Sequence, residues 1–169
     1  DILLNLSASP YTFKKLDLRT KVSSFAAQYL QVPLIYVNQV GANDNLIFDG
    51  NSFILDKNGS KIKQLKSFSE DLCSWEIDQT IPEKNKFENS EMSSIFGALV
   101  LGVRDYAKKC GFKTALIGLS GGIDSALVSA IATAALGSNN IYCVSMPSKW
   151  SSSHSKSDAK DLARRLNIN

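Results

Sequence analysis

Residues 119–126, LSGGIDSA, constrain the fold of this chain more than any other stretch, because they separate two apolar runs of different character. The run before them, TALIGL, has the length of a buried strand, and the run after them, ALVSAIATAAL, has the length of a helix. The two glycines permit a tight turn and a close approach of the backbone to a ligand. The segment therefore predicts a strand, a tight turn and a helix, in that order.

Strands and helices alternate around this turn. The spacing predicts strands at 114–119 and 141–146 and helices at 125–136 and 157–166. Such alternation indicates a parallel sheet joined by right-handed crossovers. A further helix is expected at 90–112, capped by Ser90 or Asn89 and ended by Gly111. Its apolar side chains form one stripe, of the kind that faces a core: Met92, Ile95, Phe96, Leu99, Val100, Val103 and Tyr106.

The first half of the chain has a different order of elements. The pattern predicts strands at 2–6, 33–40, 46–50, 52–59 and 60–68 and a helix at 12–31. Asp56 to Gly59 is expected to form a hairpin turn, with Asn58 and Gly59 in the left-handed conformation. After it, residues 67–89 lose their periodicity and predict a linker that docks Trp75 and Ile77.

The chain is therefore expected to be of the α/β class, with a first domain at 1–80, a linker at 81–90 and a second domain at 91–169. It begins inside a strand pattern and ends where a helix should lead into another strand, so we expect it to be an internal segment of a longer protein.

Composition narrows the choice of partners. The net charge is +3, from 19 basic and 16 acidic residues, and the basic residues are scattered. Scattered charge of this size argues against a nucleic acid or a membrane surface as the partner. No run has the length of a membrane span, and the start does not resemble a signal peptide. The three cysteines lack CxxC spacing and predict free thiols in a reducing, cytoplasmic setting, buried in the case of Cys110 and Cys143.

The residues of the turn suit an anion. A turn from the carboxyl end of a parallel strand into a helix presents backbone N–H groups and the positive end of the helix dipole. Ser120 and Ser125 add hydroxyl donors, whereas Asp124 would repel a phosphate unless it held a bridging Mg²⁺. The sequence contains neither G-x-x-x-x-G-K-[ST] nor G-x-G-x-x-G. A plain turn remains the alternative, but it would not explain two hydroxyls and a carboxylate together.

SGGIDS resembles the SGGxDS pyrophosphate loop of the N-type ATP pyrophosphatases, and VSMPSKWSSSHSKSDAKDLARRLNI is similar to the NAD synthetase branch of that superfamily. The resemblance implies a Rossmann-like synthetase domain that uses ATP and Mg²⁺, with Asp124 as the metal ligand. It assigns Ser151 and Ser152 to the dinucleotide substrate. Lys149 and Trp150 depart from the expected pattern, and His154 is expected to be a loop residue. The residues that the resemblance assigns to ATP and pyrophosphate are Leu119, Ser120, Gly121, Gly122, Asp124, Ser125, Met146 and Ser148.

The first half carries a second resemblance. ILLNLSASPYTFKK and YVNQVGANDNLIFDGNSFILDKNG are similar to the late part of a carbon–nitrogen hydrolase domain, the α-β-β-α glutaminase domain of glutamine-dependent NAD synthetases. The resemblance implies that Ser9 and Lys15 contact glutamine. The catalytic cysteine, glutamate and lysine of that chemistry are expected upstream of Asp1, and Cys73, Cys110 and Cys143 do not match the nucleophile.

Together the resemblances imply a ligase. ATP adenylates nicotinic acid adenine dinucleotide with release of pyrophosphate, and ammonia from glutamine then displaces AMP to give NAD. A cytoplasmic homo-oligomer is expected for such an enzyme. Two alternatives stay open: an N-type enzyme with another acceptor, such as a GMP-synthetase-like or tRNA-modifying enzyme, and a non-catalytic ATP-binding or nitrilase-like module. The 169-residue chain by itself is expected to be inactive.

Overall fold

The computed structural model describes residues 1–77, 90–147, 149–150 and 152–169. They form two compact units, Asp1–Ala98 and Leu99–Asn169, and the division falls inside helix α2 (Glu91–Cys110). The α/β class predicted from the sequence is confirmed. Of the predicted linker at 81–90, only Ser90 lies within the described residues.

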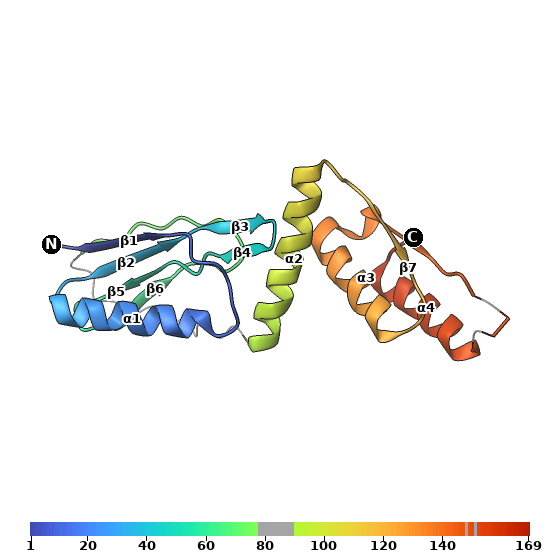
Figure 1. The fold of residues 1–169 in the computed structure, drawn as a ribbon, viewed down its shortest axis with the longest axis horizontal. Helices are drawn as coiled ribbons and strands as arrows, with labels where there is room; N and C mark the ends of the chain where they lie inside the picture. Colours follow the sequence, from blue (N-terminus) through green and yellow to red (C-terminus); the bar gives the residue numbers. More distant parts are fainter. Residues whose placement is uncertain (78–89, 148, 151) are drawn as a thin grey trace. The chain divides into compact units, whose positions relative to one another are not determined.

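The first unit contains a four-stranded mixed sheet in the order β1-β2-β5-β6, with helix α1 along one face (Figure 1). Strand β1 pairs in parallel with β2 because α1 returns the chain between them, and the remaining pairs are antiparallel. A separate antiparallel hairpin, β3 with β4, follows β2. The bounds are β1 Leu3–Ser7, α1 Lys15–Leu30, β2 Leu34–Asn38, β3 Val40–Asn43, β4 Leu46–Asp49, β5 Phe53–Leu55 and β6 Lys61–Gln64.

The core of this unit lies between α1 and the sheet. Leu34 and Tyr36 alternate with Ile35 along β2, so that they turn toward the helix, where they pack with Ala27 and Phe53. The rings of Tyr36 and Phe53 stack with their centroids 4.9 Å apart. Alternation along the strands places a second apolar set on the opposite sheet face: Leu4, Leu6, Ile35, Val37 and Ile54.

Two predictions for this unit need correction. Gly59 is left-handed, with φ +76°, but Asn58 is not, because its N–H donates to Asp56 Oδ1 at 2.9 Å and holds a local turn. Trp75 is half-buried, whereas Ile77 remains 59% exposed and does not dock. The prediction that Ile77 anchors the linker is therefore wrong for the described residues.

The second unit is built on two parallel strands, β7 (Ala115–Gly118) and β8 (Ile141–Val144), joined by α3 (Ile123–Leu136) and the short 3₁₀ helix η1 (Ser138–Asn140). Helix α4 (Ser153–Leu166) follows β8 and contacts α3 (Figure 1). On the other edge of β8, the Cys143 N–H donates to the Asn169 carbonyl and the Asn169 N–H donates to the Ile141 carbonyl. The predicted order of strand, turn, helix, strand and helix is confirmed.

Helix α2 differs from its prediction in the face that is buried. Ser90 caps it, since its Oγ accepts from the Ser93 N–H at 3.2 Å, and Gly111 ends it with φ +75°. The buried positions are Ala98, Leu101 and Ala107. The predicted stripe, in contrast, includes Met92, Phe96, Leu99, Val103 and Tyr106, which are all exposed. Cys110 is exposed as well, so its predicted burial is wrong, and Cys143 is half-buried.

Within the described residues, no helix combines the length and the apolar character needed to cross a membrane.

Candidate functional site

The glycine turn lies at the carboxyl ends of β7 and β8. Leu119 extends the parallel ladder, because its N–H donates to the Val144 carbonyl at 2.9 Å, and it is buried. Helix α3 begins three residues beyond Ser120, so its first N–H groups, which have no acceptor within the helix, face this edge of the sheet. The strand-to-helix geometry that the sequence predicted is therefore present, and such a turn suits an anion.

The two serine hydroxyls close the turn. Ser120 Oγ accepts from the Gly122 N–H at 3.2 Å and lies 3.1 Å from Ser125 Oγ. Ser125 Oγ donates to the Gly122 carbonyl at 3.0 Å. The hydroxyls are therefore preorganised beside each other at the start of α3, where an anion would meet both.

Gly121 brings a second helix to the same turn. It has φ +83°, and a Cβ built there would lie 2.1 Å from the Ser155 carbonyl oxygen. Only a glycine permits this approach between the turn and the first turn of α4. The first turn of α4 therefore packs directly against the glycine turn, beside the N-terminus of α3.

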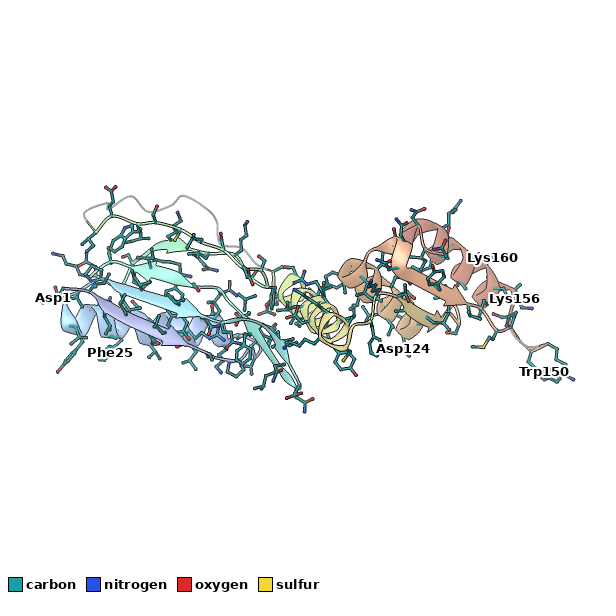
Figure 2. All side chains as sticks on the ribbon, turned by 90° about the horizontal axis from the view of Figure 1, so that it is seen from above. Asp1, Phe25, Asp124, Trp150, Lys156 and Lys160 are labelled. Atoms are coloured by element: carbon teal, nitrogen blue, oxygen red, sulfur yellow. The ribbon has the colours of Figure 1, made fainter. Side chains whose placement is uncertain are left out.

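Asp124 lies exposed in the first turn of α3 (Figure 2). Among the described residues, no group of three or more histidine, cysteine, aspartate or glutamate side chains could hold a metal. A single exposed carboxylate beside an anion site nevertheless fits Mg²⁺, which commonly takes one or two carboxylates together with phosphate oxygens and water. The donor set fits a metal that arrives with a nucleotide better than a resident metal.

The loop after β8 contributes Met146, which is exposed and whose Cε lies 3.6 Å from a Cβ built on Gly118. Met146 therefore covers the last residue of β7, beside the turn. Lys149 and Trp150 lie further along, with the Lys149 Nζ 5.3 Å from the centre of the indole ring, and Trp150 projects away from the helices (Figure 2). Ser148 and Ser151 lie outside the described residues.

Ser152 has a structural role that its sequence context did not reveal. Its Oγ accepts from the Ser155 N–H at 3.1 Å and caps α4, which is why the helix begins at Ser153 and not at 157 as predicted. His154, predicted to be a loop residue, instead lies exposed in the first turn of α4, because the helix begins earlier than predicted. A cavity of about 310 Å³ opens between this helix and the end of β8, lined in part by Leu119, Ser145, Pro147, Lys156 and Lys160.

The predicted glutamine residues lie in the first unit, at the two ends of one loop. Ser9 follows β1, and Lys15 is the first, half-buried residue of α1. Ser9 is fixed from both sides: its N–H donates to Asn38 Oδ1 at 2.9 Å, and its Oγ accepts from Arg19 Nε at 3.1 Å. The structure thus gives Ser9 a defined position on a rigid support.

The sequence did not predict the buried ion pair that holds Ser9 in place. Arg19 and Asp49 are both buried and form an ion pair at 2.8 Å, although they are thirty residues apart on α1 and β4. One signal existed in the sequence: Arg19, Ser23 and Ala27 recur at every fourth position, and all three are on the buried side of α1. An arginine on a stripe of small residues indicates a buried charge that needs a partner.

Comparison with known proteins bears on both units. The family model described as NAD synthase matches residues 95–169, which include the turn, α3, β8 and α4. Residues 95–169 are therefore similar to the NAD synthase family. The match begins inside α2 and includes the glycine turn described above.

The similarity extends beyond that domain. A glutamine-dependent NAD(+) synthetase from Synechocystis sp. is 48% identical over 100% of this chain and 31% of its own length, and one from Rhodobacter capsulatus is 41% identical over 98% and 31%. The structure of a glutamine-dependent NAD+ synthetase from Acinetobacter baumannii in complex with ADP matches with a TM-score of 0.92 and 39% identity, over 100% of this chain and 33% of that one. The chain therefore spans about a third of the length of these relatives.

Proposed function

We propose that this chain takes part in the ATP- and glutamine-dependent amidation of nicotinic acid adenine dinucleotide to NAD, through an adenylated intermediate and with release of AMP and pyrophosphate. The observation that carries the proposal is the glycine turn at the N-terminus of α3, against which the first turn of α4 packs at Gly121. Similarity to glutamine-dependent NAD(+) synthetases along the whole chain supports it, as does the ADP in the Acinetobacter baumannii relative.

The adenylation step follows from the charges at the turn. Backbone N–H groups at Gly121 and the start of α3 would hold the pyrophosphate. The Gly122 N–H and the Ser120 and Ser125 hydroxyls would add donors by exchanging their partners within the turn for phosphate oxygens. Mg²⁺, held by Asp124, would offset the phosphate charge and stabilise the leaving pyrophosphate. Leu119, Met146 and Ser148 would lie beside the nucleotide, and Ser151 and Ser152 near the dinucleotide.

The glutamine side belongs to the first unit, with Ser9 and Lys15 as contacts. In this proposal residues 1–80 are the end of an α-β-β-α glutaminase domain, 81–90 a linker, and 91–169 the first half of a Rossmann-like synthetase domain. A cysteine thiolate outside these residues would release ammonia from glutamine. A reducing cytoplasm suits such a thiolate, and a homo-oligomer is part of the proposal.

The test is Asp124→Asn in the complete protein. ATP–pyrophosphate exchange that depends on nicotinic acid adenine dinucleotide should be lost, because the amide no longer holds the metal at the phosphates. Glutamine hydrolysis should stay measurable. Asp158→Asn, an exposed carboxylate on α4, is the matched control and should leave the exchange unchanged. Normal exchange in Asp124→Asn, or exchange that requires XMP or tRNA, would overturn the proposal.

A further inference from the structure

The Arg19 side chain is the centre of a buried polar network in the first unit. Arg19 is 7% exposed and Asp49 2% exposed, and Arg19 Nη1 donates to Asp49 Oδ1 at 2.8 Å. The other two nitrogens of the guanidinium turn to the loop after β1. Nε donates to Ser9 Oγ at 3.1 Å, and Nη2 donates to the carbonyls of Ser9 and Pro10 at 2.8 and 3.1 Å. All three guanidinium nitrogens are thus engaged.

Asn38 provides a second hydrogen-bonded link between Asp49 and Ser9. Asn38 Nδ2 donates to Asp49 Oδ1 at 3.4 Å and to the Ser9 carbonyl at 3.2 Å, while Asn38 Oδ1 accepts from the Ser9 N–H. Asn51 Nδ2 donates to the other carboxylate oxygen, Asp49 Oδ2, at 2.7 Å. Both carboxylate oxygens are therefore occupied, so Asp49 fixes Arg19 and leaves it little freedom to rotate away from Ser9.

The chemistry of the guanidinium sets the direction of the Ser9 hydroxyl. Arginine only donates hydrogen bonds, so Ser9 Oγ must be the acceptor in the contact with Arg19. Its own O–H proton then points elsewhere, and within the described residues no group accepts it. Ser9 is half-buried, so the proton is available to an acceptor that enters from outside the network.

We propose that Arg19, held by Asp49, is a positioning residue that aims the Ser9 hydroxyl as a donor at an acceptor oxygen of glutamine. This inference rests on the proposed function, in which Ser9 contacts glutamine. It adds that the affinity for glutamine depends on a side chain that does not touch it. Lysine at position 19 would keep the charge beside Asp49, but its single ammonium cannot donate in the fixed fork that reaches Asp49 and Ser9 together.

The experiment uses the complete protein with the variants Ser9→Ala, Arg19→Lys and the double variant, and Lys21→Arg as the control on the exposed side of α1. Glutamine-dependent NAD formation is measured over a range of glutamine concentrations. Arg19→Lys should raise the KM for glutamine about tenfold, as expected for the loss of the hydrogen bond from the Ser9 hydroxyl to glutamine, and change kcat less than twofold. In the Ser9→Ala background the same substitution should raise KM less than threefold, because no hydroxyl remains to be aimed.

Failure of the positioning role and failure of the proposed function give different results. A threefold or larger effect of Arg19→Lys in the Ser9→Ala background, or an unchanged KM in Arg19→Lys alone, would overturn the positioning role. Exchange between ATP and pyrophosphate that fails in the unmodified protein would instead overturn the proposed function. If Arg19→Lys lowers the melting temperature, the KM for glutamine is measured at a temperature at which every variant is folded, and the same rise in KM is expected.

Discussion

Gly121 is the position in the turn where adding a single methyl group should lower stability and activity most. It has φ +83°, and the atoms that an added Cβ would meet are backbone atoms of Ser155, which cannot move aside as a side chain can. Gly121→Ala should cost more than about 2 kcal/mol of unfolding free energy, the sum of a left-handed alanine and the displacement of α4. ATP–pyrophosphate exchange should fall on the order of 100-fold, as expected for misplaced catalytic geometry.

Gly111 provides the matched control. It has a similar φ of +75°, but a Cβ built there meets no atom within 4 Å. Gly111→Ala should therefore cost only about 1 kcal/mol for the backbone conformation. Urea unfolding of the two variants measures the difference in stability. Equal losses of unfolding free energy would show that the close approach of α4 to the turn does not contribute to stability.

Burial should decide how much each ion pair contributes to the free energy of unfolding. Asp49→Ala leaves the Arg19 guanidinium buried without its carboxylate and should cost about 3–5 kcal/mol. Glu91→Gln breaks the pair of Glu91 with Lys14, in which both side chains are about 60% exposed, and should cost less than about 1 kcal/mol. Denaturant titration of both variants tests this. A loss below 1 kcal/mol in Asp49→Ala would contradict the description of the network as a buried support.

Residues close in sequence were predicted better than residues brought together by folding. The residues of the turn, Ser120, Gly121 and Asp124, lie within six consecutive positions, so the sequence alone predicts that they come together. Arg19 and Asp49 lie thirty positions apart, and their pairing depends on how α1 crosses the sheet, which no local pattern specifies. The Ser152 cap was missed for another reason, because its serine-rich surroundings offered several equivalent candidates.

At the scale of elements, α4 depends on the Ser152 hydroxyl for its first turn. Ser152→Ala should destabilise the helix by about 1 kcal/mol, because the Ser155 N–H loses its acceptor. Ser153→Ala, one position along and inside the helix, should change stability by less than about 0.5 kcal/mol. Thermal unfolding measured by circular dichroism compares the two, and equal effects would show that the cap contributes nothing.

The contribution of Asp161, near the other end of α4, to stability should depend on pH. Side-chain hydrogen bonds from Arg164 and then Arg165 hold the pKa of the Asp161 carboxyl below its ordinary value of 3.8. A carboxyl with a lowered pKa in the folded state stabilises the protein above the unfolded-state pKa and loses that contribution as the pH falls through the folded-state pKa. Asp161→Asn should therefore melt earlier than the unmodified chain at pH 7, and the difference should shrink as the pH falls below the ordinary carboxyl value of 3.8. A difference that grows on acidification would contradict this.

Element types were predicted well, but the buried face of α2 was not. Periodicity reports that Met92, Phe96 and Tyr106 share a face, and it does not report whether a partner covers that face. In the described structure Ala98, Leu101 and Ala107 are buried instead. The start of α1 illustrates a similar limit: Lys14 is left-handed, with φ +62°, and delays the helix to Lys15.

At the scale of the whole molecule, the sheet of the first unit carries more apolar surface than one helix covers. Leu34 and Tyr36 are buried beneath α1, while Leu4 and Leu6, on the opposite face, are 60% and 79% exposed. Strand β1 also lies at the edge of the sheet, with backbone groups available for pairing. Apolar residues on both faces are typical of a sheet that is covered on both sides, and the relatives are about three times as long as this chain.

The 169-residue chain by itself should therefore self-associate through β1 and the sheet face opposite α1. Leu6→Lys should reduce the association, because a charge on an edge strand opposes both apolar contact and strand pairing. It should change the free energy of unfolding by less than about 0.5 kcal/mol, since Leu6 is exposed. Leu34→Ala, on the buried face, should instead cost about 2–5 kcal/mol and leave the association in place. Sedimentation velocity across a range of concentrations measures the association, and urea titration measures stability. A chain that stays monomeric before any substitution would show that this face needs no cover.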